Sequence, residues 1–315
     1  MFLRALTALA APGRRRGRLL IFYFHRVLER PDPLLHDEPD AKTFDRMLKW
    51  IRAQFRVLDP LEACDRLYDG SLPSRAAAIT FDDGYRDNFE VALPILQRHR
   101  LSAAFFVSTG FLDGSLMFND RVIEAIRRTG RPSLTIPGRE ARVPIRNVEE
   151  RRAAIDAAIA SIKHLEPTQR EARVIELEAT LGSVAVRDLM MTPDQVAGLH
   201  RAGMRIGGHT RTHPILLSLD DSQAEREIAG SLDDLQGIIG ERTEMFAYPN
   251  GKFGGDFDDR HIAMIEAAGC RYAFTTHSGA ATATSGRYLL PRTTPWARTR
   301  LRFGLQAWKG MQVTA

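Results

Sequence analysis

The sequence predicts an α/β fold with a parallel sheet, and three observations lead to this prediction. Six short apolar runs are typical of strands buried on both faces: residues 19–24, 76–81, 103–108, 204–207, 245–248 and 272–276. Helical patterns lie between most of these runs, as in βαβ units. Turn and polar residues follow several of the runs directly. The alternation fits either an open sheet or a barrel.

The helices between the strands are predicted from apolar periodicity and from residues typical of helix ends. One helical face is marked by Phe44, Met47, Leu48, Ile51 and Phe55. Residues 89–99 and 261–268 are also predicted to be helical. The sequence Thr192-Pro193-Asp194-Gln195 combines an N-cap, a proline at the first helical position and a glutamine that completes a capping box. This helix is expected to run to Gly203, which suits the position after a helix end.

A helical insertion interrupts the alternation between residues 115 and about 190, where no further strand is expected. One amphipathic helix is marked by Val148, Ile155, Ile159, Ile162 and Leu165. Pro167 suits the first turn of a second helix, which contains Val174, Leu177 and Leu181. We interpret this segment as an insertion rather than a separate domain.

Length and composition narrow the class of protein. The chain has 315 residues, of which 44% are hydrophobic and 26% are charged, so a disordered, collagen-like or coiled-coil protein is not expected. The length allows one large barrel or two ordinary domains. No run of about 18 apolar residues occurs, so no transmembrane helix is expected. Cys64 and Cys270 form no Cys-x-x-Cys pair and are expected to be buried or free thiols.

Positive charge is concentrated near the two ends of the chain. The net charge is +5, and basic clusters occupy residues 14–18 and 298–302. Both a solvated basic surface and contact with anionic lipid headgroups fit this pattern. No recognisable nucleic-acid-binding module accompanies the charge, so nucleic acid is not expected as a partner.

The two ends of the sequence also indicate where in the cell the protein is expected. Residues 2–11 are mildly apolar, but the dense basic cluster follows them, so no cleavable signal peptide is predicted. An amphipathic N-terminal segment that touches a membrane stays an alternative. Residues 296–315 are basic and aromatic, with Trp296, Arg298, Arg300, Arg302, Phe303 and Trp308. They suit a membrane interface or a helix packed on the barrel. We expect a cytoplasmic protein or one at the inner membrane face.

Two motifs at strand ends predict a functional site. The sequence Thr80-Phe81-Asp82-Asp83-Gly84-Tyr85 ends a buried strand in two carboxylates, and sites in parallel α/β folds gather at such ends. One aspartate can bind a metal while the other acts as a base. After another strand, His209 and His213 have a spacing with which two imidazoles chelate a divalent metal. Each motif alone also fits an ordinary turn or loop, but the combination favours a metal site.

Weaker signals follow three other strands. The sequence Phe246-Ala247-Tyr248-Pro249-Asn250-Gly251 is first of all a turn, but it lies where a substrate wall or a backbone N–H donor would stand. His25 follows the first strand, His277 follows the run at 272–276, and Arg292 follows an apolar pair. Each of these three also fits a structural role.

Together these residues resemble the polysaccharide deacetylase family, the carbohydrate esterases that share a NodB-type domain. Residues 80–84 resemble the first motif of that family, and residues 209–214 resemble its second motif, His-Ser/Thr-x-x-His, in the same order. Residues 22–27 and the Phe-Ala-Tyr-Pro-x-Gly and Leu-Pro-Arg sequences are similar to a bacterial subgroup. The resemblance covers residues 19–295 and implies an irregular (β/α)7-type barrel with the helical insertion. A basic segment, 1–18, and the tail, 296–315, flank that barrel.

The resemblance implies a metal centre and a base. Asp83, His209 and His213 would bind one divalent cation, with zinc favoured over cobalt or nickel. Three protein ligands leave an open position, as a hydrolytic site needs. Asp82 would be the general base for a water molecule that the metal activates.

The resemblance also implies a pocket and a reaction. Tyr248, Pro249 and Asn250 would line the pocket, with the Asn250 N–H as the donor to the oxyanion. The implied activity is hydrolysis of a carbon–nitrogen bond other than a peptide bond. The acetyl group would be removed from an N-acetylated glycan or glycolipid.

The sequence departs from the family pattern at two places. The third family motif commonly begins with an arginine that holds the base, but the aligned residue here is Ala247, and we expect Arg292 to replace that arginine. The last family motif usually carries a histidine that protonates the leaving amine, and residues 289–292 contain none. His25 and His277 are the candidates for this acid, and His25 is favoured.

Two alternative functions stay open on the sequence alone. The same metal chemistry would serve an amidohydrolase acting on a non-sugar carbon–nitrogen bond, for which a closed small cavity is expected in place of an open groove. The two departures would also fit a catalytically impaired glycan-binding relative. If the protein is a deacetylase, the basic ends and the expected location favour a lipid-linked or nascent saccharide as its substrate over a mature wall polymer.

Overall fold

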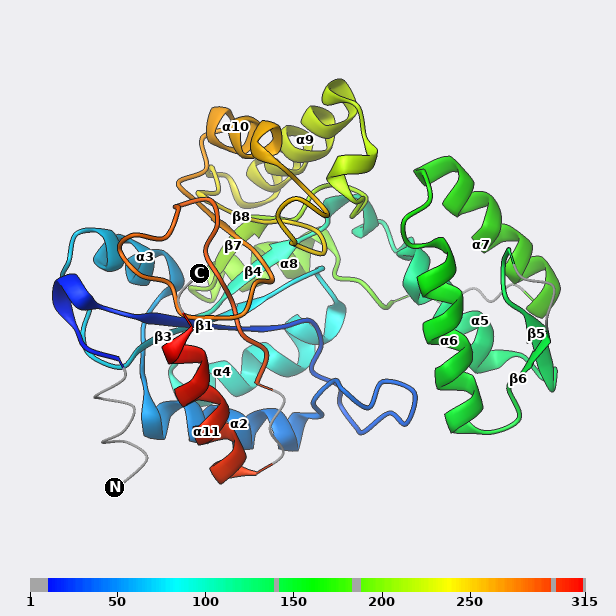
Figure 1. Cartoon of the computed structure of the whole chain (residues 1–315), viewed down its shortest axis with the longest axis horizontal. Coiled ribbons are helices and arrows are strands. Elements are labelled where there is room, and N and C mark those ends of the chain that lie inside the picture. Colours follow the sequence, from blue (N-terminus) through cyan, green and yellow to red (C-terminus); the bar gives the residue numbers. More distant parts are fainter. Residues whose placement is uncertain (1–10, 139–141, 183–187, 296–298, 314–315) are drawn as a thin grey trace.

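A curled parallel sheet forms the centre of the molecule (Figure 1). The computed structural model describes residues 11–138, 142–182, 188–295 and 299–313. The main strands, in spatial order, are β1 (Leu19–Phe24), β3 (Ala76–Phe81), β4 (Ala104–Val107), β7 (Arg205–Gly208), β8 (Met245–Ala247) and β9 (Tyr272–Phe274). The short strand β2 (Arg56–Val57) pairs with the start of β3. All six apolar runs predicted to be strands form strands at these places.

The segment 290–293 joins the two edges of this sheet. Leu290 pairs with Phe274 of β9, and Thr293 pairs with Phe22 of β1, both in parallel orientation. The Thr293 N–H donates to the Ile21 carbonyl at 2.8 Å, and the Tyr23 N–H donates to the Thr293 carbonyl at 3.2 Å. The sheet therefore curls into the irregular barrel that the sequence predicts.

Helices surround the sheet on the outside (Figure 1). They are α2 (Ala41–Gln54), α3 (Pro60–Tyr68), α4 (Leu93–His99), α8 (Pro193–Arg201), α9 (Asp221–Ile239), α10 (Asp259–Ala267) and α11 (Arg300–Gln312). A π-helical turn, Asn88–Ala92, precedes α4. The predicted capping box of Thr192 and Gln195 starts α8, and Gly203 follows its end with a φ of +81°. No helix in the described part of the chain combines the length and the apolar composition needed to cross a membrane.

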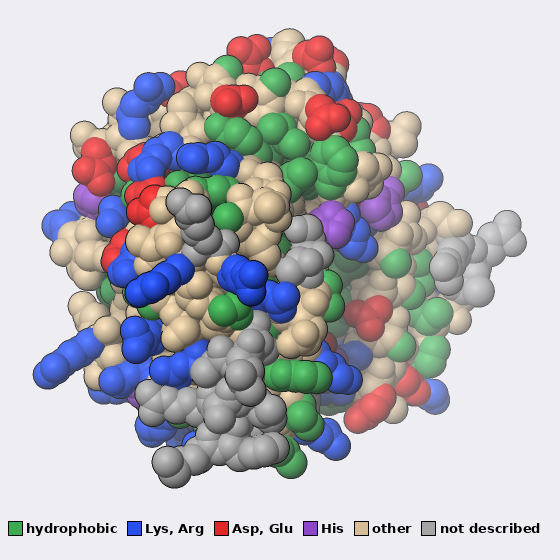
Figure 2. Space-filling model, turned by 60° about the vertical axis from the view of Figure 1, so that its left-hand side comes forward, with side chains coloured by type: hydrophobic (Ala, Val, Ile, Leu, Met, Phe, Trp, Pro, Cys, Tyr) green, Lys and Arg blue, Asp and Glu red, His purple; other side chains and the backbone are tan. Residues whose placement is uncertain are grey.

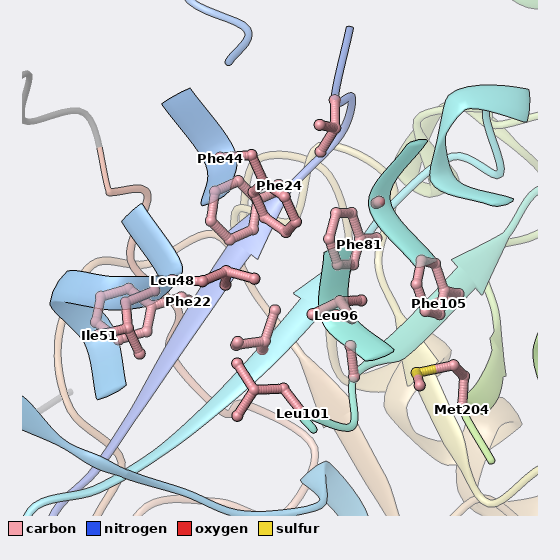
Figure 3. Close-up of a cluster of buried hydrophobic side chains, with 14 of the residues drawn as sticks. Phe22, Phe24, Phe44, Leu48, Ile51, Phe81, Leu96, Leu101, Phe105 and Met204 are labelled. Carbon is pink, nitrogen blue, oxygen red and sulfur yellow. The ribbon is translucent and has the colours of Figure 1, made fainter. Parts of the chain in front are cut away.

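Alternation along β3 determines which side chains face the barrel interior. Ile79 and Phe81 pack into an outer core under α2 and α4, in which Phe81 stacks on Phe24 at 5.4 Å and on Phe105 at 4.7 Å (Figure 3). Each fully buried phenylalanine stabilises the fold by about 1.5–3 kcal/mol. Because successive side chains of a strand point to opposite faces, Asp82 is directed into the barrel.

The insertion forms a small lobe at one side of the barrel (Figure 1). It contains α5 (Phe118–Arg128), β5 (Ser133–Thr135), β6 (Arg142–Pro144), α6 (Val148–Ile162) and α7 (Pro167–Leu181). The two helices predicted there are present, and Pro167 occupies the first turn of α7. The expectation of no further strand was wrong, because β5 and β6 form an antiparallel hairpin. Strands of three residues are too short to show the alternation that identifies a strand in sequence.

Candidate active site

The two motifs meet at the carboxyl ends of β3 and β7, which are separated in the sheet by β4. Asp82 and Asp83 follow β3 directly, and His209 follows β7. The backbone turns sharply at both places, since Asp83 has a φ of +78° and His213 a φ of +53°. Such left-handed conformations cost about 1–3 kcal/mol for residues with a side chain and cluster at functional sites. The strain is consistent with side chains aimed at a ligand.

Asp83, His209 and His213 form a compact group of metal-ligating side chains. The Nε2 atoms of the two imidazoles lie 3.3 Å and 3.4 Å from Oδ1 of Asp83. One potential ligand atom of each residue lies within 4.8 Å of those of the other two. These three side chains are therefore placed to share one small cation.

The orientation of His209 fits a ligand role. Its Nδ1 lies 2.7 Å from the carbonyl oxygen of Ala247, so we assign the proton to Nδ1 and a free lone pair to Nε2. Metal-ligating histidines commonly donate their other N–H to a carbonyl in this way. Burial lowers the pKa of His213 to about 4, which keeps that imidazole neutral near pH 7. One carboxylate and two imidazoles are a donor set that suits zinc.

Arg292 holds Asp82 in the barrel interior. Its two terminal nitrogens lie 2.6 Å and 2.7 Å from the two carboxylate oxygens of Asp82. Arg292 is fully buried, and its Nε donates to the carbonyl of Thr275 at 3.0 Å. Burial alone would raise the pKa of Asp82, but the Arg292 guanidinium holds it below its ordinary value. Asp82 is thus kept as a carboxylate in a fixed orientation.

Asp82, Asp83, His209 and His213 line one cavity of about 400 Å³, whereas Arg292 is not part of its wall. The other side chains on its wall are Tyr23, His25, Arg26, Leu35, Glu38, Tyr85, Asn119, Asp120, Ile123, Tyr248, Asn250 and Thr276. His25 therefore lines the cavity. Among the described residues, His277 and Pro249 are not part of its wall. Pro249 is buried between two residues that do line the cavity, as alternation along an extended chain would give.

The turn after β8 offers a backbone donor. Asn250 has a φ of +60°, and its carbonyl accepts a hydrogen bond from the Thr276 hydroxyl at 2.5 Å. None of the backbone hydrogen bonds among the described residues uses the Asn250 N–H. The ring of Tyr248 stacks on Phe257 at 3.5 Å and is fully buried. Tyr248 thus supports the wall through packing, and Asn250 presents its backbone there.

His25 lies among carboxylates. Burial lowers the pKa of its imidazole, but the nearby Asp83 and Glu38 carboxylates outweigh burial and raise the pKa above its ordinary value. Its backbone carbonyl accepts a hydrogen bond from Asn88 at 2.8 Å. A histidine with a raised pKa is more fully protonated near neutral pH and is able to give up a proton.

Sequence reasoning missed several residues of the cavity wall. Glu38 lies in the loop before α2, and its carboxylate accepts a hydrogen bond from the Arg26 N–H at 3.2 Å. Asn119 and Asp120 come from α5 of the insertion. None of these three follows a strand of the barrel, so the rule that located the other residues could not find them.

Comparison with known proteins agrees with the fold. The sequence model of the polysaccharide deacetylase family matches residues 69–273. The putative polysaccharide deacetylase YxkH of Bacillus subtilis (strain 168) is 22% identical over 253 residues, which is 80% of this chain. The chain spans 63% of the length of that relative.

Two solved structures show the same fold. The Streptococcus pyogenes deacetylase PplD, solved in complex with acetate, matches with a TM-score of 0.61 at 18% identity, covering 94% of this chain and 99% of PplD. IcaB from Ammonifex degensii matches with a TM-score of 0.58 at 18% identity, covering 95% and 99% of the two chains. Since the family model matches well over half of its residues, this chain belongs to the polysaccharide deacetylase family.

Proposed function

We propose that this protein is a metal-dependent deacetylase that removes the acetyl group from an N-acetylated sugar of a polysaccharide, oligosaccharide or lipid-linked glycan. The observation that carries the proposal is that Asp82, held by its ion pair with Arg292, lines one cavity together with Asp83, His209 and His213. A fixed carboxylate next to a three-residue metal site is the arrangement that amide hydrolysis with an activated water molecule needs.

The residues of the chain have separate tasks in this reaction. A divalent cation held by Asp83, His209 and His213 would supply Lewis-acid chemistry, which lowers the pKa of water and polarises a carbonyl. Asp82 accepts the proton of the attacking water molecule, and Arg292 keeps that carboxylate oriented and ionised.

The remaining steps are carried out by His25 and by the turn after β8. The Asn250 N–H donates a hydrogen bond to the oxygen of the acetyl group as negative charge develops there. His25 donates a proton to the departing amine nitrogen, because an amine is a poor leaving group until it is protonated. His277 is less suited to this step, since it is not part of the cavity wall.

A long substrate is favoured over a small non-sugar amide. A second cavity of about 430 Å³ adjoins the first, and the two share Tyr23, His25, Leu35 and Glu38. Proline and aromatic side chains, among them Trp50, line the second cavity. The combined space extends well beyond one acetylated sugar, as expected for a glycan. The Asp82–Arg292 pair also removes one of the two departures that favoured an impaired glycan-binding relative.

Acetate release tests this proposal directly. The zinc-loaded protein is incubated with N-acetylglucosamine oligosaccharides, and acetate is measured against the Asp82→Asn variant. The Asp194→Asn variant, which changes an exposed carboxylate at the start of α8, is the matched control. We expect release by the wild type and by the control but not by Asp82→Asn. No release from any N-acetylhexosamine glycan or glycolipid would refute the proposal.

We also propose that α11 contacts an anionic membrane surface. Phe303 is buried on the barrel side of α11, whereas Leu301, Leu305 and Trp308 are exposed at helical spacing on the other side. The basic side chains Arg300, Arg302 and Lys309 of the same helix are exposed beside them, and Figure 2 shows Lys and Arg side chains spread over this face of the molecule. Apolar and cationic groups together suit binding to anionic headgroups. Trp296, Arg298 and residues 2–10 lie outside the described residues.

Vesicle flotation tests the membrane contact. We expect the wild type to float with phosphatidylglycerol vesicles more than with phosphatidylcholine vesicles. The Leu305→Asp/Trp308→Asp variant should lose this binding, and Ile175→Asp, at an exposed apolar residue of α7, should retain it. Absence of binding by the wild type, or unchanged binding by the double variant, would contradict the proposal.

A further inference from the structure

The helical insertion reaches the catalytic cavity through the first turn of α5. Asn119, Asp120 and Ile123 lie on the cavity wall, although the rest of the lobe packs around its own apolar core. The same cavity wall includes His25 and Glu38. The insertion therefore contributes side chains to the space that the substrate occupies.

Asp120 has unused capacity for hydrogen bonds. Its side chain is almost fully buried, with 4% exposed, and both oxygens accept from the same donor, the Tyr85 hydroxyl, at 3.2 Å. Among the described residues no basic side chain lies within ion-pair distance of Asp120. A carboxylate has about four acceptor positions, so most of those on Asp120 are open. Burial raises the pKa of Asp120 to about 7, although the charge of Arg26, which lies beyond ion-pair distance, acts to lower it.

Asn119 gives a second observation of the same kind. Its side-chain oxygen is buried and has no hydrogen-bond partner among the described residues. A buried acceptor without a partner costs about 1–3 kcal/mol, so such groups normally meet a donor from a ligand or an ordered water molecule. Two adjacent residues of the cavity wall thus carry acceptors that lack a full set of donors.

The chemistry of these acceptors identifies the class of ligand. They require O–H or N–H donors, and the hydroxyl groups of a neutral pyranose provide several within a short distance. A phosphorylated or carboxylated sugar would be repelled by the ionised form of Asp120. Asp120 is not part of the metal-ligating group, so the geometry does not support a role for Asp120 in binding the metal.

We propose that Asn119 and Asp120 bind hydroxyl groups of the neutral sugar whose acetamide faces Asp82, which makes the insertion a specificity element of the site. This inference rests on the proposed deacetylase function. A purely structural role is weaker, because other contacts already hold the lobe against the barrel. Tyr85, Met117 and Met190 form an apolar cluster, and the Met191 N–H donates to the Gly84 carbonyl at 2.9 Å.

Saccharide binding tests the inference. The probe is the N-acetylglucosamine tetramer, titrated calorimetrically into the zinc-loaded Asp82→Asn protein, in which turnover is blocked. Adding Asn119→Ala or Asp120→Asn should weaken binding about tenfold or more, since each lost hydrogen bond of this kind costs about 1–3 kcal/mol. Asp156→Asn, at an exposed carboxylate of the same lobe, is the matched control and should bind normally.

Monodeoxy analogues separate recognition from a structural effect. The parent protein should bind the analogue that lacks the hydroxyl contacted by Asn119 more weakly than it binds the complete saccharide. The Asn119→Ala variant should bind the two compounds with equal affinity. Equal saccharide affinity of the variants and the parent would overturn the inference. Acetate release by the wild type would still support the deacetylase function in that case. A parent protein that binds no saccharide would also overturn it. In that case the proposed deacetylase function is tested separately, by measuring acetate release from other N-acetylated substrates.

Discussion

Arg292 and Asp82 form a two-pronged ion pair inside the barrel, although 210 positions of the sequence separate them. The fork of the guanidinium matches both carboxylate oxygens, which fixes the plane of the carboxylate as well as its charge. The aligned position that carries arginine in related sequences is Ala247, whose carbonyl here accepts a hydrogen bond from His209. One arginine delivered from a different segment is thus placed to hold the base.

Replacing Arg292 should impair catalysis even when the charge is kept. Arg292→Lys retains a cation but loses the second prong, so we expect kcat to fall roughly 10- to 100-fold from misorientation of Asp82. Arg292→Met leaves a buried carboxylate unpaired and should lower the free energy of unfolding by about 3–5 kcal/mol. Kinetics of acetate release and urea unfolding measure the two effects.

A double variant sharpens this test. Arg292→Ala/Ala247→Arg moves the arginine to the position that it commonly has in related sequences. Recovery of part of the activity lost in Arg292→Ala would show that the two positions are interchangeable. Full activity of Arg292→Lys would show that orientation of Asp82 by a fork is unimportant.

The metal centre should depend on both histidines. We expect about one zinc ion per wild-type chain, and none in His209→Ala/His213→Ala, because a single carboxylate holds zinc poorly. Saturation to 100 times the dissociation constant stabilises the folded state by about 2.7 kcal/mol, so zinc should raise the melting temperature of the metal-free wild type only. Mass spectrometry of metal content and thermal unfolding provide the readouts.

His200→Ala is the control for this prediction, since His200 is a partly exposed histidine of α8 near Glu241. It should bind zinc like the wild type. Zinc binding by the double variant at full stoichiometry would place the metal site elsewhere.

The identity of the general acid can be decided with two leaving groups. His25→Gln should lower kcat roughly 100-fold on an N-acetylated sugar, whose amine must be protonated as it leaves. The same variant should hydrolyse an aryl acetate almost normally, because a phenolate departs without a proton. His277→Ala should leave both reactions unchanged. A large loss of aryl acetate hydrolysis in His25→Gln would instead indicate a role in orientation or metal binding.

Asp120 should make stability depend on pH. The pKa of Asp120 is raised from 3.8 to about 7 in the folded protein, so folding favours its protonated form. The corresponding stability is present in full below about pH 4 and is lost as pH rises through about 7. Asp120→Asn does not titrate, so its stability relative to the wild type should increase between pH 4 and pH 8, by up to about 4 kcal/mol.

Urea unfolding of the metal-free proteins at several pH values tests this prediction, with Asp156→Asn as the exposed control. A stability difference between Asp120→Asn and the wild type that is the same at pH 5 and pH 8 would contradict it.

The parts of the fold and site that the sequence predicts well are those governed by local patterns. The strands of the barrel are continuous apolar runs, and the motifs at Asp82–Asp83 and His209–His213 directly follow two of them. Because parallel strands end at the same edge of a sheet, strand ends alone predict that these side chains meet. The capping box of α8 is local in the same sense.

The parts that the sequence could not predict depend on contacts between distant segments. The pairing of segment 290–293 with both sheet edges places Arg292 beside Asp82, and no local pattern encodes that pairing. Asp120 reaches the cavity only because the lobe folds back on Tyr85. In α11, burial of Phe303 and exposure of Leu305 depend on how the helix lies against β1 and α2.

The closure of the barrel by segment 290–293 also has a consequence for synthesis of the chain. A ribosome makes Asp82, Asp83, His209 and His213 long before it makes Arg292. On the proposed mechanism, the candidate metal ligands and the candidate base are therefore synthesised before the cation that would orient the base. Full catalytic competence then requires that the closing segment has left the ribosome and paired with β1. If the proposed roles hold, the order of translation would delay hydrolysis until the barrel around the site is complete.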